Sequence, residues 1–421
     1  MNIATSVPKK PINAYGEIFG QLTDNASFLW ILRSIAVEQP HYSVSDLREL
    51  EQRIDAQLDA LMTSIEQSWQ CCLEALELGE PGEVFTATVL AFRSHDVKKI
   101  QIAIEAGLDN SESEKGLISA LAWLPGKLVH GWIEKFLTSK DLNHKYLAVA
   151  ACSVRRENPG EMLTRIMQRD DCKQHTKLYA RALRLIGEIR RQDLMPAIDE
   201  AMLLDDEEIS FWSTWSAILL GKGDAVEGLK PYIFQDGVHQ QKAINIAFRV
   251  LPVEQGRQWI AELGKSSGQA RAVIKATGVL GDPHAVNWLI TKMEQPEVAQ
   301  LAAESFSYIT GIDLEQNQLI NESPAKLAQQ PNDDPDDDNV GLDEDENLPW
   351  PDIDKVKTIW INHGRNFIAG KRYFLGREIT VELLKDKLVN ANQRQRHAAA
   401  MELALIDSSM PLQNTRAKVS F

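Results

Sequence analysis

The chain has 421 residues, of which 44% are hydrophobic, and its formal net charge is −15. A chain of this length can bury a substantial core, and no stretch approaches the apolar length of a membrane span. The acidic balance disfavours direct nucleic-acid binding, because affinity for the phosphate backbone comes from lysine and arginine.

The cysteines and the N-terminus indicate a cytoplasmic protein. No apolar segment follows Lys9 and Lys10, so we expect no secretory signal. The cysteine spacing fits neither a zinc site nor a disulfide framework, which suits a reducing compartment. The four residues are Cys71, Cys72, Cys152 and Cys172.

Residues 1–83 are predicted to form an N-terminal helical region. The apolar run Phe28–Leu32 indicates a buried helix. A second helix is predicted from apolar residues at helical spacing, namely Leu47, Leu50, Ile54, Leu58 and Leu61.

Residues 84–320 are predicted to form an array of helical repeats. An apolar pattern at positions i, i+3, i+4 and i+7 recurs seven times, with starts 29 to 34 residues apart, which is enough for two short helices and two turns. The starts are Leu117, Leu147, Tyr179, Ser213, Ile244, Val273 and Ala302. The i+3 position is always alanine or serine, which allows two helices to approach closely; these residues are Ala120, Ala150, Ala182, Ser216, Ala247, Ala276 and Ser305.

Helix-ending and helix-starting residues stand between these patterns. In the clearest copy, Gly281 is placed to end one helix, Asp282 to cap the next, and Pro283 to fill its first position. Residues 84–312 therefore resemble the short bacterial form of the HEAT repeat. The predicted fold class is all-α, an α-solenoid of HEAT-like helix pairs.

Residues 321–349 are predicted to be an acidic disordered linker. Positions 333–346 hold nine acidic residues and no basic one, and such tracts remain solvated. A second interpretation is docking of a basic partner, with Asp336, Asp337 and Asp338 as candidate protein-binding residues. A calcium loop is disfavoured, because Asn347 stands where a ligating glutamate is needed.

Residues 350–421 are predicted to form a C-terminal helical segment that caps the array. Two helices are indicated, one starting near Val381 and one carrying Ala399 and Ala400. We expect Trp350 and Trp360 to anchor the end of the linker. We also expect Arg372 or Arg394 to pair with acidic residues of the array.

The sequence carries no recognisable catalytic motif, so we predict no enzyme activity, no cofactor and no metal site. One edge stands out as a candidate protein-binding site, where four acidic residues precede two tryptophans. The candidate residues are Asp205, Asp206, Glu207, Glu208, Trp212 and Trp215. The acids also suit the start of a helix, and we expect at least one of the tryptophans to be buried between repeats.

The tail resembles an uncharacterised proteobacterial family of HEAT-repeat proteins encoded near type VI secretion genes. The resemblance rests on Leu348–Asp352, Trp360, Phe367, Arg372, Tyr373 and Gln393–Ala400. It implies a cytoplasmic immunity protein that binds and neutralises an effector toxin, possibly a basic nuclease. The alternatives are an effector adaptor or chaperone, or a general interaction scaffold. In each case the expected partner is a protein, with neither nucleic acid nor membrane involved.

Overall fold

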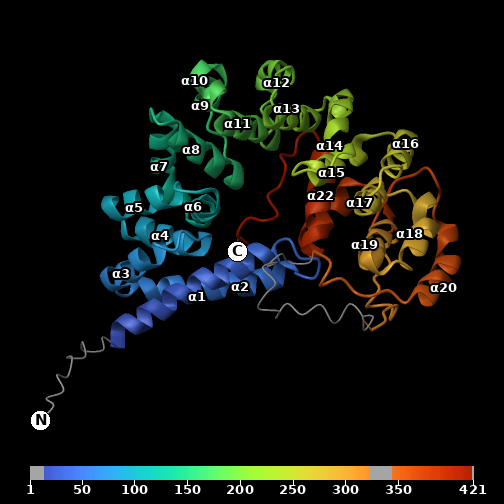
Figure 1. Cartoon of the computed structure of the whole chain (residues 1–421), viewed down its shortest axis with the longest axis horizontal. Helices are drawn as coiled ribbons and strands as arrows, with labels where there is room; N and C mark the ends of the chain where they lie inside the picture. Colours follow the sequence, from blue (N-terminus) through green and yellow to red (C-terminus); the bar gives the residue numbers. More distant parts are fainter. Residues whose placement is uncertain (1–13, 323–343, 420–421) are drawn as a thin grey trace, which may run out of the picture. The chain divides into compact units, whose positions relative to one another are not determined.

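The computed structural model describes residues 14–322 and 344–419 (Figure 1). Within these ranges nearly all regular structure is helical, with one short hairpin of strands β1 (Tyr373–Phe374) and β2 (Arg377–Glu378). The predicted all-α class is confirmed. The chain divides into two compact units. One comprises Met1–Val37, Ser45–Arg155 and Arg416–Phe421, and the other comprises Glu38–Val44 and Arg156–Thr415.

The first unit is a series of helices that pack on one another in succession. Helix α1 packs on α3 and α4, α4 packs on α6, and α6 packs on α8. Their bounds are α1 (Ala14–Ala36), α2 (Val44–Met62), α3 (Ile65–Leu76), α4 (Pro81–Ser94), α5 (Val97–Gly107), α6 (Ser111–Trp123), α7 (Gly126–Thr138) and α8 (Leu142–Arg155).

Two expectations for the N-terminal region have different outcomes. The stripe of α2 is buried as predicted, from Leu47 to Leu61. The run in α1 is buried only in part, because Phe28 is 58% exposed while Leu29 and Trp30 are buried. The prediction of a buried helix is therefore correct for Leu29 and Trp30 and wrong for Phe28.

The C-terminal residues of the chain belong to the first unit. The Lys418 ammonium lies 2.6 Å from the Asp55 carboxylate and 4.3 Å from the centre of the Trp123 ring. The backbone NH of Val419 donates to Glu51, which also pairs with Arg33. These contacts fix the end of the chain against α2 and α6.

The second unit contains the regular part of the array. Helices α11, α13, α15, α17 and α19 pack in succession, and shorter helices alternate with them. The α-helices are α9 (Glu161–Gln168), α10 (Asp170–Gln174), α11 (Thr176–Glu188), α12 (Met195–Ala201), α13 (Glu207–Leu219), α14 (Lys230–Phe234), α15 (Gln240–Val250), α16 (Val253–Leu263), α17 (Ala270–Leu280), α18 (Val286–Lys292), α19 (Ala299–Thr310), α20 (Ile353–His363), α21 (Val381–Asn390) and α22 (Gln393–Ile406). The 3-10 helices are η1 (Gln192–Leu194), η2 (Gly223–Leu229), η3 (Pro283–Ala285), η4 (Pro296–Val298) and η5 (Gly364–Asn366).

The small residues of the repeat lie where helices touch. All seven are buried. The Ser216 hydroxyl of α13 donates to the Leu183 carbonyl of α11 at 2.8 Å, and a Cβ on Gly187 would lie only 2.8 Å from the Ser216 Cα. Serine at this position therefore both narrows the spacing between helices and bonds across it.

The predicted signals between helices are also present. Gly281 adopts a left-handed conformation with φ +71° and ends α17, and Asp282 accepts from the backbone NH of His284. Glycine reaches positive φ without steric cost, which explains its place at this helix end.

The C-terminal end of the predicted linker 321–349, from residue 344 on, is packed against the helices and is not disordered as predicted. Asp345 is buried and pairs with Arg271 of α17 at 2.5 Å, while Glu344 pairs with Lys275 at 2.9 Å. Gln300 of α19 donates to the Asp345 carbonyl. Residues 344–349 are thus packed, because the basic face of α17 binds the last acids of the tract.

The prediction that the C-terminal segment caps the array holds for α20 but not for α22. Helix α20 packs on α18, but α22 packs on α13 and α15, in the interior of the series. One expected arginine pair is present, because Arg394 lies 3.1 Å from Glu304 of the array, whereas Arg372 pairs with Glu402 within the C-terminal segment. Arg372 also donates to the carbonyl of Leu280, at the end of α17.

Candidate protein-binding ridge

Two exposed loops of the second unit carry apolar side chains among acidic ones. Leu203 and Leu204, between α12 and α13, are 87% and 46% exposed, and Val238, between α14 and α15, is 77% exposed. Single exposed aliphatic side chains are common on protein surfaces, but a patch of them among charged residues is typical of a contact surface. We call this surface the acidic ridge. It comprises Leu203, Leu204, Asp205, Glu207, Asp236 and Val238, of which the three acids are exposed.

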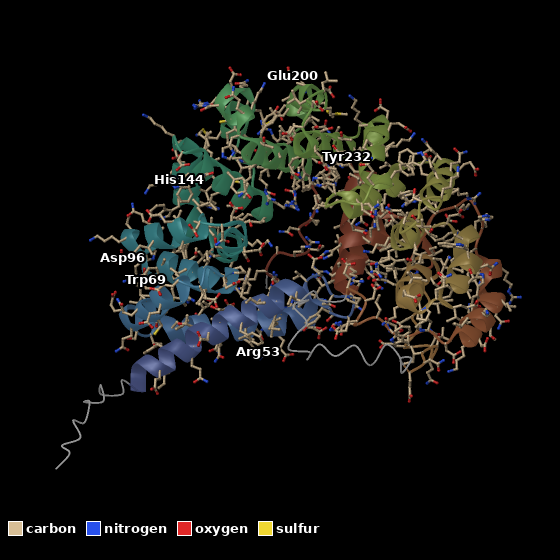
Figure 2. All side chains as sticks on the ribbon, viewed as in Figure 1. Arg53, Trp69, Asp96, His144, Glu200 and Tyr232 are labelled. Carbon is tan, nitrogen blue, oxygen red and sulfur yellow. The ribbon has the colours of Figure 1, made fainter. Side chains whose placement is uncertain are left out.

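Hydrogen bonds join the two loops of the acidic ridge. The Tyr232 hydroxyl of α14 (labelled in Figure 2) donates to the Glu207 carbonyl at 3.0 Å. His239 lies 2.8 Å from the Glu208 carboxylate. Burial raises the pKa of the Tyr232 phenol, and the negative charges of Glu207, Asp206 and Glu208 raise it further, outweighing the opposing hydrogen bond with Ser210.

The loop that carries Val238 is also held on its other side. Gln269 donates to the Asp236 carboxylate at 2.8 Å and accepts from Gln240 at the same distance. Gln240 also donates to the Ile233 carbonyl. A surface held in this way loses little conformational freedom when it binds.

The four acids 205–208 have two different roles. Asp206 caps α13 by accepting from the backbone NH of Ile209 at 3.0 Å, and Glu208 accepts from the Trp212 indole at 2.7 Å. Asp205 and Glu207 are exposed. The helix-start interpretation therefore holds for Asp206 and Glu208, while Asp205 and Glu207 remain candidates for binding.

The tryptophans do not form an exposed edge. Trp212 and Trp215 are 7% and 5% exposed, which confirms that at least one is buried and contradicts their use as surface anchors. The Arg184 guanidinium lies 4.6 Å from the centre of the Trp212 ring, and Phe211 stacks on His239. The reason is that α11, α12, α15 and α22 all pack around α13.

Sequence reasoning missed the apolar residues of the acidic ridge. Leu203 and Leu204 follow the last residue of α12, so they fall outside any helical period, and Val238 stands between glycine and histidine. The only available signal was apolar residues in predicted loops. The other candidates, Asp336, Asp337 and Asp338, lie outside the described residues.

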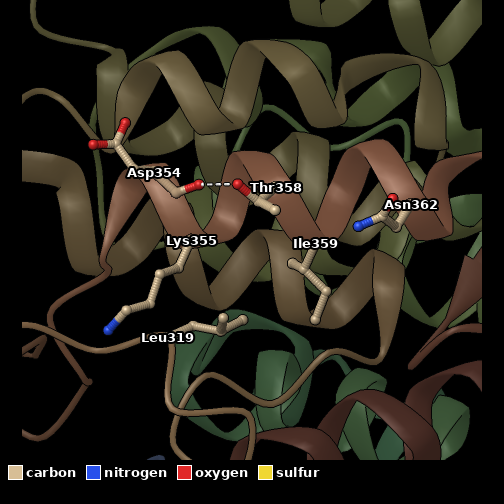
Figure 3. A pocket seen from close by; sticks show the side chains of 6 residues that line it. All are labelled: Leu319, Asp354, Lys355, Thr358, Ile359 and Asn362. Carbon is tan, nitrogen blue, oxygen red and sulfur yellow. Dashed lines mark hydrogen bonds between the residues drawn. The ribbon is translucent and has the colours of Figure 1, made fainter.

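Other surface features offer less chemistry. An open hollow on α20 is lined by an ordinary helix side, where the Thr358 hydroxyl donates to the Asp354 carbonyl one turn earlier (Figure 3). Its other lining residues are Leu319, Lys355, Ile359 and Asn362.

In residues 14–322 and 344–419, no group of three or more histidine, cysteine, aspartate or glutamate side chains could hold a metal ion. Over the same ranges, no helix combines the length and apolar character needed to cross a bilayer.

Comparison of the chain with protein-family models, curated proteins and solved structures finds no match.

Proposed function

We propose that this chain is a non-enzymatic, protein-binding repeat protein whose acidic ridge binds a basic partner protein. The observation that carries the proposal is the exposure of Leu203 and Val238 beside exposed acids, on loops held by hydrogen bonds. Burying one such side chain contributes about 1.5–3 kcal/mol, so covering Leu203 and Val238 would add to the stability of a complex. The acids around them would steer a basic protein and reject an acidic one.

The resemblance of the tail directs this proposal to type VI secretion. The partner would be a cognate effector toxin, such as a basic nuclease, and the chain would act as its immunity protein in the cytoplasm. Binding at the acidic ridge would then cover part of the toxin's surface, and the substrate could no longer reach the toxin. The alternative is an adaptor or chaperone that carries the effector without neutralising it.

The test uses the toxin encoded beside this chain, expressed in cells with and without the chain. Immunity predicts that intact protein restores growth, and that D205K/E207K and L203S/V238S both lose protection and binding while keeping the wild-type melting curve. The control is E49K/E105K, which makes the same charge change at exposed residues of α2 and α5 in the first unit.

Three results would contradict the proposal or part of it. Binding that is equal for the intact protein and both ridge variants would remove the acidic ridge from the interface. Export of the toxin that depends on this chain, without any protection of the producing cell, would favour the adaptor. Catalytic turnover of nucleic acid or a small molecule by the purified protein would refute the non-enzymatic function.

A further inference from the structure

A second exposed surface of the same unit has the opposite charge. From the last residues of α20 to the segment before β1, residues 361–371 contain no acidic residue, and Ile361 and Ile368 are 78% and 56% exposed. Arg365 and Lys371 are exposed beside them. We call residues 361–371 the basic turn. The wider stretch 353–378 holds six basic residues against two acidic ones, in a chain whose net charge is −15.

The basic turn is held firmly in place. The Phe367 ring lies 5.4 Å from that of Trp360 and 4.9 Å from that of Tyr373. The backbone NH of Ile368 donates to the Tyr373 hydroxyl, and that of Gly370 donates to the Asp282 carboxylate at 2.9 Å. The aromatic rings pack against one another, so the apolar side chains that the basic turn exposes are aliphatic ones, Ile361 and Ile368.

The charges of the basic turn are only partly compensated by its neighbours. Lys371 lies 3.0 Å from Glu378, but both side chains are at least half exposed. Lys357 of α20 makes a similar exposed pair with Glu294. Exposed pairs of this kind are weak and can exchange partners at little cost.

We propose that the acidic ridge of one copy binds the basic turn of a second copy. This rests on the proposed function, because it uses the same ridge. Both surfaces expose aliphatic side chains: Leu203 and Val238 on the acidic ridge, and Ile361 and Ile368 on the basic turn. The charged residues around them are acidic on the ridge and basic on the turn. The match in chemistry favours this partner over single-stranded nucleic acid, which requires exposed rings for base stacking.

The contact must be between copies. Helix α12 packs beside α13, near one end of the helix series of the second unit, and α20 packs on α18 at the other end (Figure 1). Two different surfaces that meet in this way give a head-to-tail contact, which produces rings or open chains of molecules. Self-association would cover the acidic ridge, so a basic partner has to compete for it.

The experiment measures the mass of the purified full-length protein by sedimentation velocity over a wide range of concentrations. We expect the mass to rise with concentration at low salt and to fall when salt screens the charges. D205K/E207K and R365E/K371E should each weaken self-association by about tenfold or more. The controls E49K/E105K and R53E/K98E should associate like the wild type.

A mixture of the two reversed variants gives the sharpest result. D205K/E207K carries two basic surfaces and R365E/K371E two acidic ones, so neither can self-associate. Mixed together they regain complementary surfaces, and the mass should rise again. Strict monomers at every concentration, or self-association unaffected by either charge reversal, would overturn the proposal.

Further measurements distinguish failure of this inference from failure of the proposed function. R365E/K371E should still bind a basic partner through its intact acidic ridge, so failure of self-association alone leaves the proposed function standing. Binding of phosphatidylserine vesicles or single-stranded DNA by monomeric protein, lost in R365E/K371E, would assign the basic turn to that ligand and overturn the inference.

Discussion

The close contact between α11 and α13 can be tested with one methyl group. In Gly187→Ala the new Cβ would lie 2.5 Å from the Ser216 Oγ and 2.8 Å from its Cα. Carbon atoms prefer separations of about 3.5–4.0 Å, so the two helices must move apart by about 1 Å. This would also stretch the bond from Ser216 to the Leu183 carbonyl, now 2.8 Å.

The expected loss can be estimated from opposing terms. Overpacking costs about 1–3 kcal/mol, and a lost hydrogen bond costs about 1 kcal/mol. Alanine recovers at most about 1 kcal/mol through its better helix propensity. We therefore expect Gly187→Ala to destabilise the second unit by about 1–3 kcal/mol. Gly278→Ala should behave alike, because its Cβ would lie 2.8 Å from the Ser305 Oγ.

The assay is urea unfolding followed by circular dichroism, with separate fits if the two units unfold separately. The matched control is Gly223→Ala, since no atom lies within 4 Å of its added Cβ and the residue belongs to the same unit. That variant should be neutral or slightly more stable. Equal unfolding midpoints for Gly187→Ala and Gly223→Ala would refute the close spacing of α11 and α13.

Three further perturbations test the packing and the docked segments. Ala182→Leu and Ala276→Leu should each cost about 1–3 kcal/mol in the same urea assay, and unchanged midpoints would contradict their placement between helices. Arg372→Met should lower the free energy of unfolding by about 3–5 kcal/mol, because it removes one of the two arginines that pair with the buried Glu402. A smaller loss than in Ala182→Leu would show that Arg249 alone is a sufficient partner for Glu402. The hydrogen bond from Lys275 lowers the pKa of Glu344, so docking of residues 344–349 is favoured above the usual carboxyl pKa of about 4.3 and lost as pH falls through the lowered value. The protection of the backbone NH groups of this segment, relative to their intrinsic exchange rates at each pH, should fall at acid pH, and Lys275→Met should weaken that dependence.

The helix series could be predicted because its causes are local. The spacing of apolar residues marks each helix, and the small residue at the second position marks the closest approach to its neighbour. Gly281 and Asp282 have the predicted conformation and bond because helix ends are governed by a few adjacent residues. None of these signals depends on residues far away in the sequence.

The C-terminal segment could not be placed because its contacts are distant in sequence. Glu402 of α22 lies in a buried ion pair with Arg249 of α15, and Arg190 donates to the carbonyl of Ala404 in the last turn of α22 and to that of Met410 beyond it. In the sequence these arginines are indistinguishable from solvated ones. The return of α22 against α13 and α15 gives Arg249 its acidic partner and Arg190 its carbonyl partners.

The acidic run 205–208 shows how one sequence feature can serve both folding and binding. Asp206 is the N-cap residue and accepts from the backbone NH of Ile209, and Glu208 lies one helical turn before Trp212 and accepts from its indole, while Asp205 and Glu207 are exposed. Reversing all four charges would remove the cap and the Trp212 bond together with the exposed charges, and loss of binding would then have two causes. Reversing Asp205 and Glu207 alone changes the surface and keeps both internal bonds. A binding defect in that variant, with an unchanged melting curve, can therefore be attributed to the interface.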